Sequence, residues 1–319
     1  MLFESEKLTS TPVVSIVVLA YNHEKYIKIC LENILNQNFH HNYEIIIADD
    51  CSQDATRDIC YEYFTLYPNI VRLLFQESNQ GLLCNYRDAT ALCRGKYIAQ
   101  CAGDDYWCDR DKLRLQYEYL KNNKEYGFVR TCGYELKNNE LIKKTGGHAY
   151  DVGDVRNIAI FGPVAFASSI FFERKLLSYI DFNTLIQRGI TMEDYPMHAI
   201  FSHHTKFALI KKPMVVYRVL SESISHTKNY ERKMNFYIGF YNCKKYIKEL
   251  YEEECPWTLE ELEDDINYQK LRYFYLKCNL TKARNIVFKT KKYDRYLLVR
   301  AKQSIIFFCL CSLILHCKR

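Results

Sequence analysis

The pattern of apolar runs in the first third of the chain constrains its fold more than any other feature. Residues 13–20 form an almost unbroken run of β-branched and other apolar residues, and residues 43–48 form a second one. Strands that lack alternation between polar and apolar residues are typical of parallel sheets covered on both faces. Ile27, Leu31 and Ile34 follow the first run at helical spacing. A strand–helix–strand unit is therefore predicted.

The same alternation continues to about residue 105. We expect a second helix with Ser52 as its N-cap, a strand at 70–75, a helix at 82–93 and a buried strand that begins near residue 95. Strands and helices that alternate in this way are typical of a doubly wound sheet. The predicted fold class is α/β, with a mostly parallel, Rossmann-like sheet.

The rest of the chain divides into two parts. We expect helices at 109–122 and from about residue 194, and strands at 128–132, 165–172 and 215–219. After about residue 227 glycine becomes scarce and helix-forming residues dominate. We therefore predict an α/β domain over residues 1–226, followed by a basic, mainly helical region with a short apolar tail over residues 227–319.

The composition is that of a globular protein, with 48% hydrophobic and 26% charged residues. The net charge of +6 is too small to indicate nucleic-acid binding. None of the 14 cysteines forms a C-x-x-C pair, so structural zinc is not expected. We interpret the cysteines as reduced core thiols of a cytoplasmic protein.

The C-terminal region carries a strong positive charge. Residues 270–302 contain eleven Lys or Arg residues and a single acidic one, and an apolar stretch at 305–315 follows. This stretch is too short to span a bilayer as a regular helix. A basic segment before a short apolar tail favours peripheral contact with anionic lipid on the inner face of the cell membrane. The alternative is a basic helical face followed by a helix that docks on the core.

Two adjacent carboxylates, Asp104 and Asp105, stand where the fourth predicted strand ends. Ligands of open α/β sheets bind at this edge. Neighbouring ionised carboxylates repel each other, and a divalent cation beside a phosphate-bearing ligand would hold them together. The alternative is a solvated acidic turn that caps the helix beginning near Asp109.

Five short polar motifs follow one another along the chain, four of them at predicted strand ends. They are Ala20-Tyr21-Asn22, Asp49-Asp50-Cys51-Ser52-Gln53-Asp54, Asn79-Gln80-Gly81, Gly103-Asp104-Asp105 and Glu193-Asp194. Over roughly residues 12–226 this set resembles the family 2 glycosyltransferases of the GT-A fold. The resemblance implies an inverting sugar transfer of the bacterial surface-polysaccharide type, with Mn²⁺ or Mg²⁺ as cofactor.

The resemblance also implies where the donor binds. Asp105 would be the direct metal ligand, and Asp104 would lie nearer the donor ribose or sugar hydroxyls. Asp50 would accept a hydrogen bond from the base, with uracil favoured. The full donor-binding set is Ala20, Tyr21, Asn22, Asp49, Asp50, Asn79, Arg87 and Asp104. For Asp49, a structural role as a cap or salt-bridge partner is an equal alternative.

The sequence departs from the family pattern at two positions. Cys51 replaces the usual glycine, so ordinary backbone angles are expected there. Arg87-Asp88 replaces a frequent Arg-Asn pair. Arg87 would either reach the donor phosphates or be neutralised by Asp88.

The last motif supplies the candidate general base. Inverting transfer needs a carboxylate that removes the proton of the acceptor hydroxyl. The resemblance favours Asp194 as the base and Glu193 as the residue that orients it or binds the acceptor. The alternative is two acids placed favourably at a helix N-terminus. His226 is a candidate for a further metal contact, and Tyr217-Arg218 for a phosphate contact. A surface position is the alternative for His226.

The predicted function is transfer of one sugar from a nucleotide donor, with UDP favoured, to a hydroxyl of a glycan or lipid-linked glycan. A nucleotidyltransferase would need a Gly-rich basic loop after the first strand, and residues 20–24 contain neither glycine nor arginine. A processive synthase would need a Gln-x-x-Arg-Trp element, and neither Trp107 nor Trp257 stands in one. A non-catalytic scaffold of the same fold is the remaining alternative, although no acidic motif is lost.

Overall fold

The computed structural model describes residues 1–8, 11–144, 155, 156, 158, 166–220, 229–276, 282 and 286. The chain forms two compact units, residues 1–256 and residues 257–319. His226 and the apolar stretch at 305–315 lie outside the described residues, so the predictions made for them are not tested. No helix in the described part of the chain is long and apolar enough to cross a membrane.

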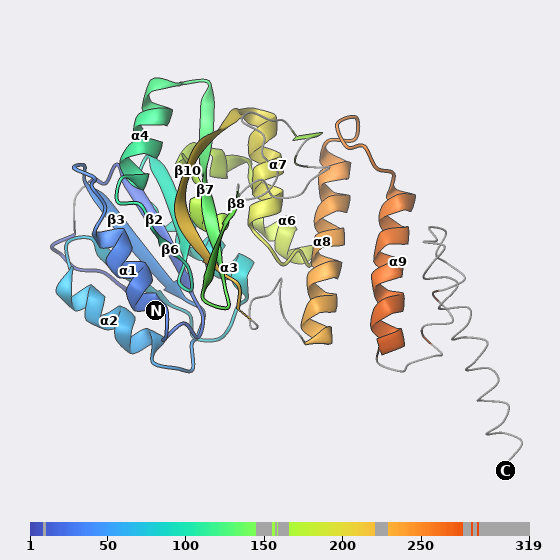
Figure 1. The fold of residues 1–319 in the computed structure, drawn as a ribbon, viewed down its shortest axis with the longest axis horizontal. Coiled ribbons are helices and arrows are strands. Elements are labelled where there is room, and N and C mark those ends of the chain that lie inside the picture. Colours follow the sequence, from blue (N-terminus) through green and yellow to red (C-terminus); the bar gives the residue numbers. More distant parts are fainter. Residues whose placement is uncertain are drawn as a thin grey trace, which may run out of the picture. The chain divides into compact units, whose positions relative to one another are not determined.

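The first unit is built on a mixed α/β sheet with a parallel core (Figure 1). The parallel strands lie in the order β4 (Val71–Phe75), β3 (Tyr43–Asp49), β2 (Val14–Ala20) and β5 (Tyr97–Ala102). The helices between them are α1 (Ile27–Leu35), α2 (Thr56–Leu66) and α3 (Leu82–Ala91). A short strand, β1 (Leu2–Phe3), pairs antiparallel with β4. The predicted doubly wound sheet is confirmed.

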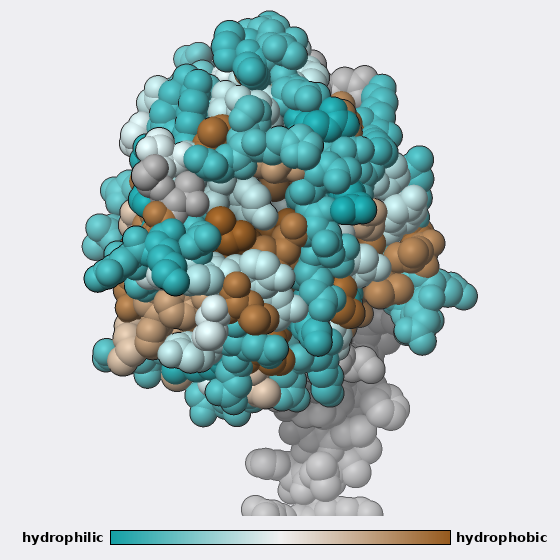
Figure 2. All heavy atoms as spheres, turned by 90° about the vertical axis from the view of Figure 1, so that its left-hand side faces the viewer, coloured by the Kyte–Doolittle hydropathy of each residue, from teal (hydrophilic) through white to brown (hydrophobic). Residues whose placement is uncertain are grey.

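The central strands are buried on both faces, as their continuous apolar sequence predicts. Ile16, Val17 and Val18 of β2 have no exposed surface, and the same holds for residues 45–47 of β3. Such burial removes most of the apolar area of these strands from water and stabilises the unit by roughly 25 cal/mol per Å². Figure 2 shows that the outer face on the side of α1 and α2 is mostly hydrophilic, with hydrophobic residues in small patches.

Beyond β5 the sheet becomes mixed. The order continues with β9 (Phe171–Glu173), β7 (Tyr126–Lys137), β10 (Lys206–Arg218) and β6 (Tyr106–Trp107), and β8 (Glu140–Lys144) pairs with β7. β9 is antiparallel to both of its neighbours, β10 is parallel to β7, and β6 is antiparallel to β10. Because β6 follows the acidic pair directly, its pairing brings the end of β10 to that pair.

Helices cover this half of the unit. They are α4 (Lys112–Asn122), the 3-10 helices η1 (Ala167–Ser169) and η2 (Arg174–Tyr179), α6 (Phe182–Gln187), α7 (Asp194–His204) and α8 (Tyr230–Leu250). α8 packs on α7, with the rings of Tyr195 and Phe240 stacked 5.0 Å apart. The compact unit therefore extends to residue 256 and includes α8, while the predicted functional boundary at residue 226 stays a prediction.

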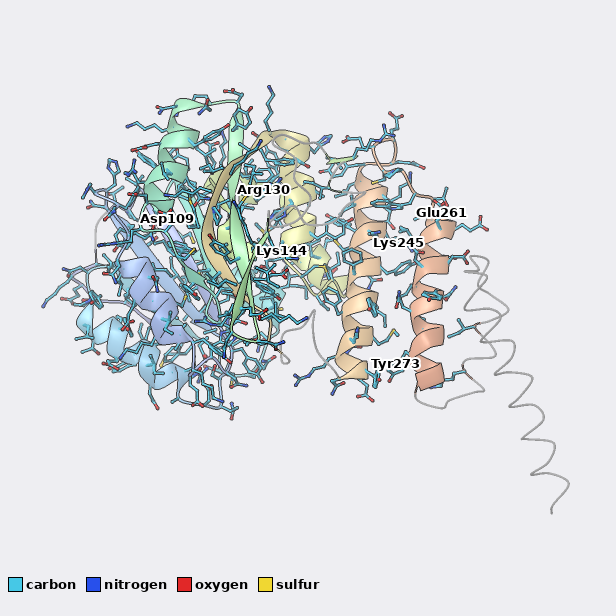
Figure 3. All side chains as sticks on the ribbon, in the orientation of Figure 1. Asp109, Arg130, Lys144, Lys245, Glu261 and Tyr273 are labelled. Carbon is cyan, nitrogen blue, oxygen red and sulfur yellow. The ribbon has the colours of Figure 1, made fainter. Side chains whose placement is uncertain are left out.

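The second unit contains α9 (Leu259–Leu276). At its start Glu261 Oε2 accepts a hydrogen bond from Thr258 N (3.0 Å), and Thr258 Oγ1 accepts one from Glu261 N (3.1 Å). This reciprocal pair is a capping box, which satisfies two N–H groups that the helix itself cannot bond. Figure 3 shows Glu261 near the start of α9 and Tyr273 near its end.

Several predicted element bounds need correction. The strand predicted at 215–219 is the last part of the much longer β10, and within the range predicted at 165–172 a 3-10 helix precedes the short β9. Ser52 does not cap α2, whose N-cap residue is Ala55. Its hydroxyl instead bonds to Asp49 and accepts from the backbone N–H of Asn22. The ten cysteines of the described residues are all free, and seven of them are buried.

Candidate active site

The carboxyl ends of β2, β3 and β5 lie level with one another. Ala20 is in register with Asp49, and Leu19 is in register with Ala102. Asp50 N donates a hydrogen bond to Ala20 O (2.9 Å), and Gly103 N donates one to Leu19 O (2.8 Å). The loops that follow the three strands, which carry three of the sequence motifs, therefore leave the sheet at one edge.

Hydrogen bonds join the first two of these loops. Asn22 N donates to Ser52 Oγ (2.8 Å), and Asn22 Oδ1 accepts from Gln53 N (2.8 Å). His23 N donates to Thr56 Oγ1 (2.8 Å). The amide of Asn22, a predicted donor-binding residue, thus holds the loop in place. The preceding Tyr21 is 42% exposed, so its ring is open to a ligand.

Asp49 and Asp50 have different surroundings. Asp49 is fully buried and forms an ion pair with Arg57 (2.5 Å), and Ser52 N donates to it (3.0 Å). The structural alternative considered for Asp49 is thus the arrangement observed. The prediction of ordinary backbone angles at Cys51 is wrong, because its φ is 65°. Closure of the turn by the bonds between Asp49 and Ser52 holds this left-handed conformation, which is unfavourable for a non-glycine residue.

Asp50 joins the second motif to the third. Its two carboxylate oxygens accept from Gln80 N (2.7 Å) and Gly81 N (2.9 Å), and its carbonyl accepts from Asn79 Nδ2 (3.3 Å). The turn needs glycine, because Gly81 has a φ of 83°. Burial raises the pKa of Asp50 even though the two N–H groups oppose the shift. Each oxygen keeps a lone pair for a further donor.

The acidic pair at the end of β5 is asymmetric. Asp105 is only 2% exposed, and its carboxylate accepts from Ser168 Oγ (2.6 Å) and from Arg218 N (3.0 Å). Burial, followed by the charge of Asp104, raises the pKa of Asp105 well above its usual range. The Asp104 side chain is 16% exposed and lies 3.9 Å from His23 Nε2. Within the described ranges nothing donates a hydrogen bond to its carboxylate.

Arg218 contacts both residues of this pair through its backbone N–H and its guanidinium. It is buried at the end of β10, with its guanidinium 5.1 Å from the ring of Tyr26 and 4.7 Å from that of Tyr106. It donates to the backbone carbonyl of Asp104. The sequence predicted a phosphate contact for Arg218 and no role for Ser168. Ser168 stands in an apolar stretch, and no local signal marks it.

The acidic pair fits a divalent cation that is shared with a ligand. Carboxylate oxygens are the donors that Mg²⁺ and Mn²⁺ prefer. The described residues contain no group of three or more His, Cys, Asp or Glu side chains able to enclose a metal ion. A site with one or two carboxylates, completed by phosphate oxygens of a substrate, matches this arrangement.

The second acidic motif lies at the start of α7. Glu193 is its N-cap residue, and Asp194 Oδ1 accepts from Tyr195 N (2.7 Å). Burial raises the pKa of Glu193 to about 8, with a contribution from Asp194, and burial raises the pKa of Asp194 to about 6. Glu193 also contributes to the raised pKa of Tyr86, whose hydroxyl donates to Gln100 of β5 (2.8 Å). The charge of Glu193 thus acts on a side chain that is hydrogen-bonded to β5.

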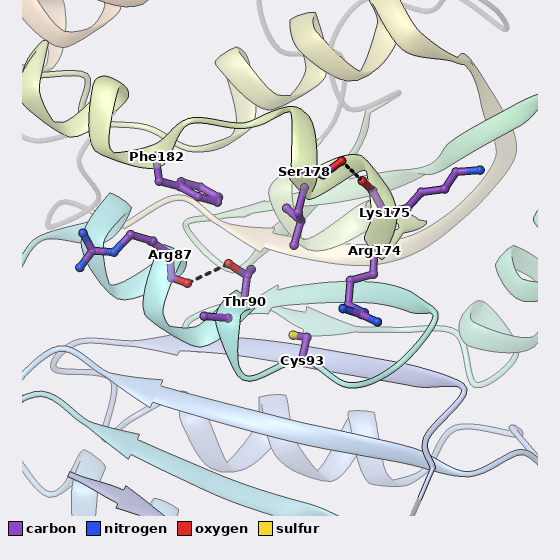
Figure 4. Close-up of a pocket in the computed structure, with 9 residues that line it drawn as sticks. Arg87, Thr90, Cys93, Arg174, Lys175, Ser178 and Phe182 are labelled. Atoms are coloured by element: carbon purple, nitrogen blue, oxygen red, sulfur yellow. Dashed lines mark hydrogen bonds between the residues drawn. The ribbon is translucent and has the colours of Figure 1, made fainter.

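Arg87 forms an ion pair with Asp88, which is one of the two arrangements expected for it. Its guanidinium lies 2.8 Å from Asp88 and 3.3 Å from Asn183 Oδ1. It lines a cavity of about 380 Å³ between α3 and η2, together with Arg174 and Phe182 (Figure 4).

The mixed α/β sheet and the acidic edge match the GT-A fold of glycosyltransferases. The family model described as Glycosyl transferase family 2 matches residues 15–184. That range is more than half of the chain, so the chain belongs to this family.

The chain is also similar to bacterial proteins over part of its length. The chain is 29% identical over 230 residues to an uncharacterised protein of Mycobacterium tuberculosis, with 69% of this chain and 62% of the relative covered. The chain thus spans about three fifths of that relative's length. It is 32% identical over 135 residues to the putative teichuronic acid biosynthesis glycosyltransferase TuaG of Bacillus subtilis, with 42% of this chain and 50% of TuaG covered.

Solved structures share the fold at low identity. TarS of S. aureus has a TM-score of 0.55 at 16% identity, covering 82% of this chain and 43% of TarS. The mannosyltransferase PcManGT of Pyrobaculum calidifontis, in complex with GDP-Man and Mn²⁺, has a TM-score of 0.54 at 14% identity, covering 94% of this chain and 81% of PcManGT. At such identities the likeness shows a common fold.

Proposed function

We propose that this protein transfers a single sugar, with inversion, from a UDP-sugar to a hydroxyl of a glycan or lipid-linked glycan acceptor, and that it needs Mn²⁺ or Mg²⁺. The observation that carries the proposal is the convergence of Asp50, Asp104 and Asp105 at one sheet edge, with the Asp104 carboxylate open to a ligand. The name of TuaG refers to teichuronic acid biosynthesis, which agrees with a glycan acceptor.

The donor nucleotide would bind along the first two loops. Tyr21 offers an exposed ring beside the base, and Asp50 offers carboxylate lone pairs to a base N–H. A base without that donor would desolvate the remaining lone pairs of Asp50 without replacing their hydrogen bonds, which gives specificity. Asn79 orients the turn that holds Asp50. Structures that share the fold contain UDP-GlcNAc or GDP-Man, and both uracil and guanine carry an N–H that Asp50 could accept, so the choice of UDP rests on the family resemblance.

The acidic pair would bind the diphosphate through a shared cation. Asp105 is held rigidly and Asp104 is presented to the ligand, so together they can fix the position of the leaving group. A bound divalent cation would neutralise the charge that develops on the departing phosphate. Arg218 adds a fixed positive charge beside the pair.

Asp194 would act as the general base. Its carboxylate would take the proton of the acceptor hydroxyl while that oxygen bonds to the anomeric carbon and the diphosphate departs from the opposite face. Buried Glu193 beside it keeps the pair from being fully ionised at neutral pH. Because the two groups interact, their titration belongs to the pair.

The test is release of UDP from a panel of UDP-sugars in the presence of Mn²⁺ and glycan acceptors. Asp194→Asn is expected to lower kcat by about 10²–10⁴-fold with nucleotide affinity unchanged. In the wild type kcat should fall as the pH drops below about 6, since a protonated carboxylate cannot accept the proton. Asp58→Asn is the control, because Asp58 is an exposed acid in the first turn of α2. It shows what the loss of a negative charge near a helix N-terminus does by itself. Equal activity of the two variants would contradict the proposal.

The scaffold alternative predicts nucleotide binding without turnover for every donor in the panel. Peripheral contact of the C-terminal region with the inner face of the cell membrane stays a prediction, because most of residues 270–319 lie outside the described residues.

A further inference from the structure

The buried carboxylate of Asp105 needs a fixed orientation if it is to hold a cation. Each of its oxygens accepts one hydrogen bond from the protein, from Ser168 Oγ (2.6 Å) and from Arg218 N (3.0 Å). The second donor belongs to the backbone, so Ser168 is the side chain that sets the plane of this carboxylate. It belongs to η1, 63 residues further along the chain.

The direction of the Ser168 hydrogen bond is determined by its surroundings. Ala102 N donates to Ser168 Oγ (3.1 Å), which occupies a lone pair of the hydroxyl. A hydroxyl has a single proton, and a carboxylate oxygen lies 2.6 Å away, so that proton points to Asp105. Ser168 thus links the last residue of β5 to the carboxylate three residues later.

The backbone around Ser168 is held by a buried polar network. Trp107 Nε1 donates to Ser168 O (3.0 Å), and Gln116 Nε2 donates to Ser169 O (2.8 Å). Lys112 Nζ donates to Gln116 Oε1 (2.8 Å), which fixes the orientation of that amide, and it also lies 4.1 Å from the Trp107 ring. Hydrogen bonds in a buried network of this kind favour one rigid arrangement of the backbone around Ser168.

We propose that Ser168 is a positioning residue for cation binding, because its hydroxyl holds the Asp105 carboxylate in the orientation that leaves the outer lone pairs free for the metal. The inference rests on the proposed role of Asp105 and adds a residue that no motif contains. Hydrogen bonds to ligating groups typically contribute 10–100-fold to metal affinity.

The chain offers a matched control next to Ser168. Ser169 is equally buried, and its hydroxyl has no hydrogen-bond partner within the described ranges. Replacing either serine by alanine removes the same atom from the same depth. The two variants therefore separate the hydrogen bond to Asp105 from the general effect of a lost core hydroxyl.

The experiment measures Mn²⁺ bound in the presence of UDP by electron paramagnetic resonance, for the wild type, Ser168→Ala and Ser169→Ala. We expect Ser168→Ala to raise the Kd for Mn²⁺ by about 10–100-fold, with kcat regained at saturating Mn²⁺, and Ser169→Ala to change the Kd by less than about threefold. Equal Kd values for the two variants would overturn the inference. A wild type that binds no Mn²⁺ with any nucleotide would overturn the proposed function instead.

Trp107→Phe provides a second route if Ser168→Ala fails to fold. It removes the indole N–H that donates to Ser168 O and keeps an aromatic ring beside Lys112. The expected change is a smaller rise in the Kd for Mn²⁺, in the same direction. An unchanged Kd in a folded Trp107→Phe protein, as judged by its melting curve, would count against the network.

Discussion

Two buried carboxylates lie at opposite ends of the same parallel sheet, and their partners differ. Glu44, near the start of β3, is fully buried and accepts from Ser15 Oγ (2.7 Å), Arg94 N (2.8 Å) and the guanidinium groups of Arg94 (2.8 Å) and Arg72 (3.3 Å). Asp105, just after β5, accepts hydrogen bonds from one hydroxyl, that of Ser168, and from one backbone N–H, that of Arg218.

The difference separates an acid whose charge is paired within the protein from the acid for which we propose cation binding. Buried charges are normally paired, and Glu44 is paired completely by groups of its own chain. Asp105 stands beside a second carboxylate, Asp104, and its own oxygens accept only from a hydroxyl and a backbone N–H. A cation bound with the nucleotide would add positive charge beside these two carboxylates.

The largest effect on activity is expected for substitution of Asp105, at the carboxyl ends of the parallel strands. Asp105→Asn should lower the rate of transfer by about 10³-fold or more, because the cation loses a ligand. The melting temperature should stay the same or rise, since the substitution removes a buried, poorly compensated charge. Sugar-transfer assays and thermal melts of the same preparation check this. A large loss of stability would mean that Asp105 is a structural acid like Glu44.

The opposite pattern is expected at the amino end of the strands. Glu44→Gln leaves Arg72 and Arg94 without their shared carboxylate, so the free energy of unfolding should fall by about 3–5 kcal/mol. Nucleotide affinity of the folded fraction should not change. Urea unfolding measures the loss, and Glu62→Gln, on the exposed face of α2, serves as the control. Weaker nucleotide binding by folded Glu44→Gln would contradict a purely structural role for Glu44.

Lys112 is a third buried charge and gives the smallest test. Burial lowers its pKa to about 7 from 10.5, so between these values the unfolded chain binds more protons than the folded one. Stability should therefore rise with pH across that window, by up to about 1.4 kcal/mol per pH unit.

Lys112→Met should remove this rise, whereas Lys121→Met, at an exposed position of α4, should keep it. Denaturant unfolding at pH 7 and pH 9 measures both. The same slope in wild type and Lys112→Met would show that the ammonium has another counter-charge, and the network behind Ser168 would need revision.

Local patterns were enough to predict the parallel core and most of the acidic edge. The apolar runs of β2 and β3 and the motifs after them depend on neighbours in sequence, and they appear where expected. The length of β10 could not be predicted, because Lys211-Lys212-Pro213 interrupts the apolar pattern where its register with β7 shifts.

Contacts between distant segments account for the remaining differences. Ser168 and Arg218 reach Asp105 only through the pairings of β9 and β10, which no residue spacing encodes. The left-handed turn at Cys51 is likewise maintained by hydrogen bonds of the folded loop, against the preference of the residue itself.

The most direct test of the account is calorimetric titration of the protein with UDP, with and without Mn²⁺, and with GDP as the competing nucleotide. We expect the wild type to bind UDP more tightly when Mn²⁺ is present. The affinity of the Asp105→Ala variant for UDP should not change when Mn²⁺ is added. GDP binding in place of UDP would move the donor to GDP-sugars and leave the cation site intact. If the wild type bound UDP equally strongly with and without Mn²⁺, this would contradict the central claim that Asp105 binds a cation together with the nucleotide.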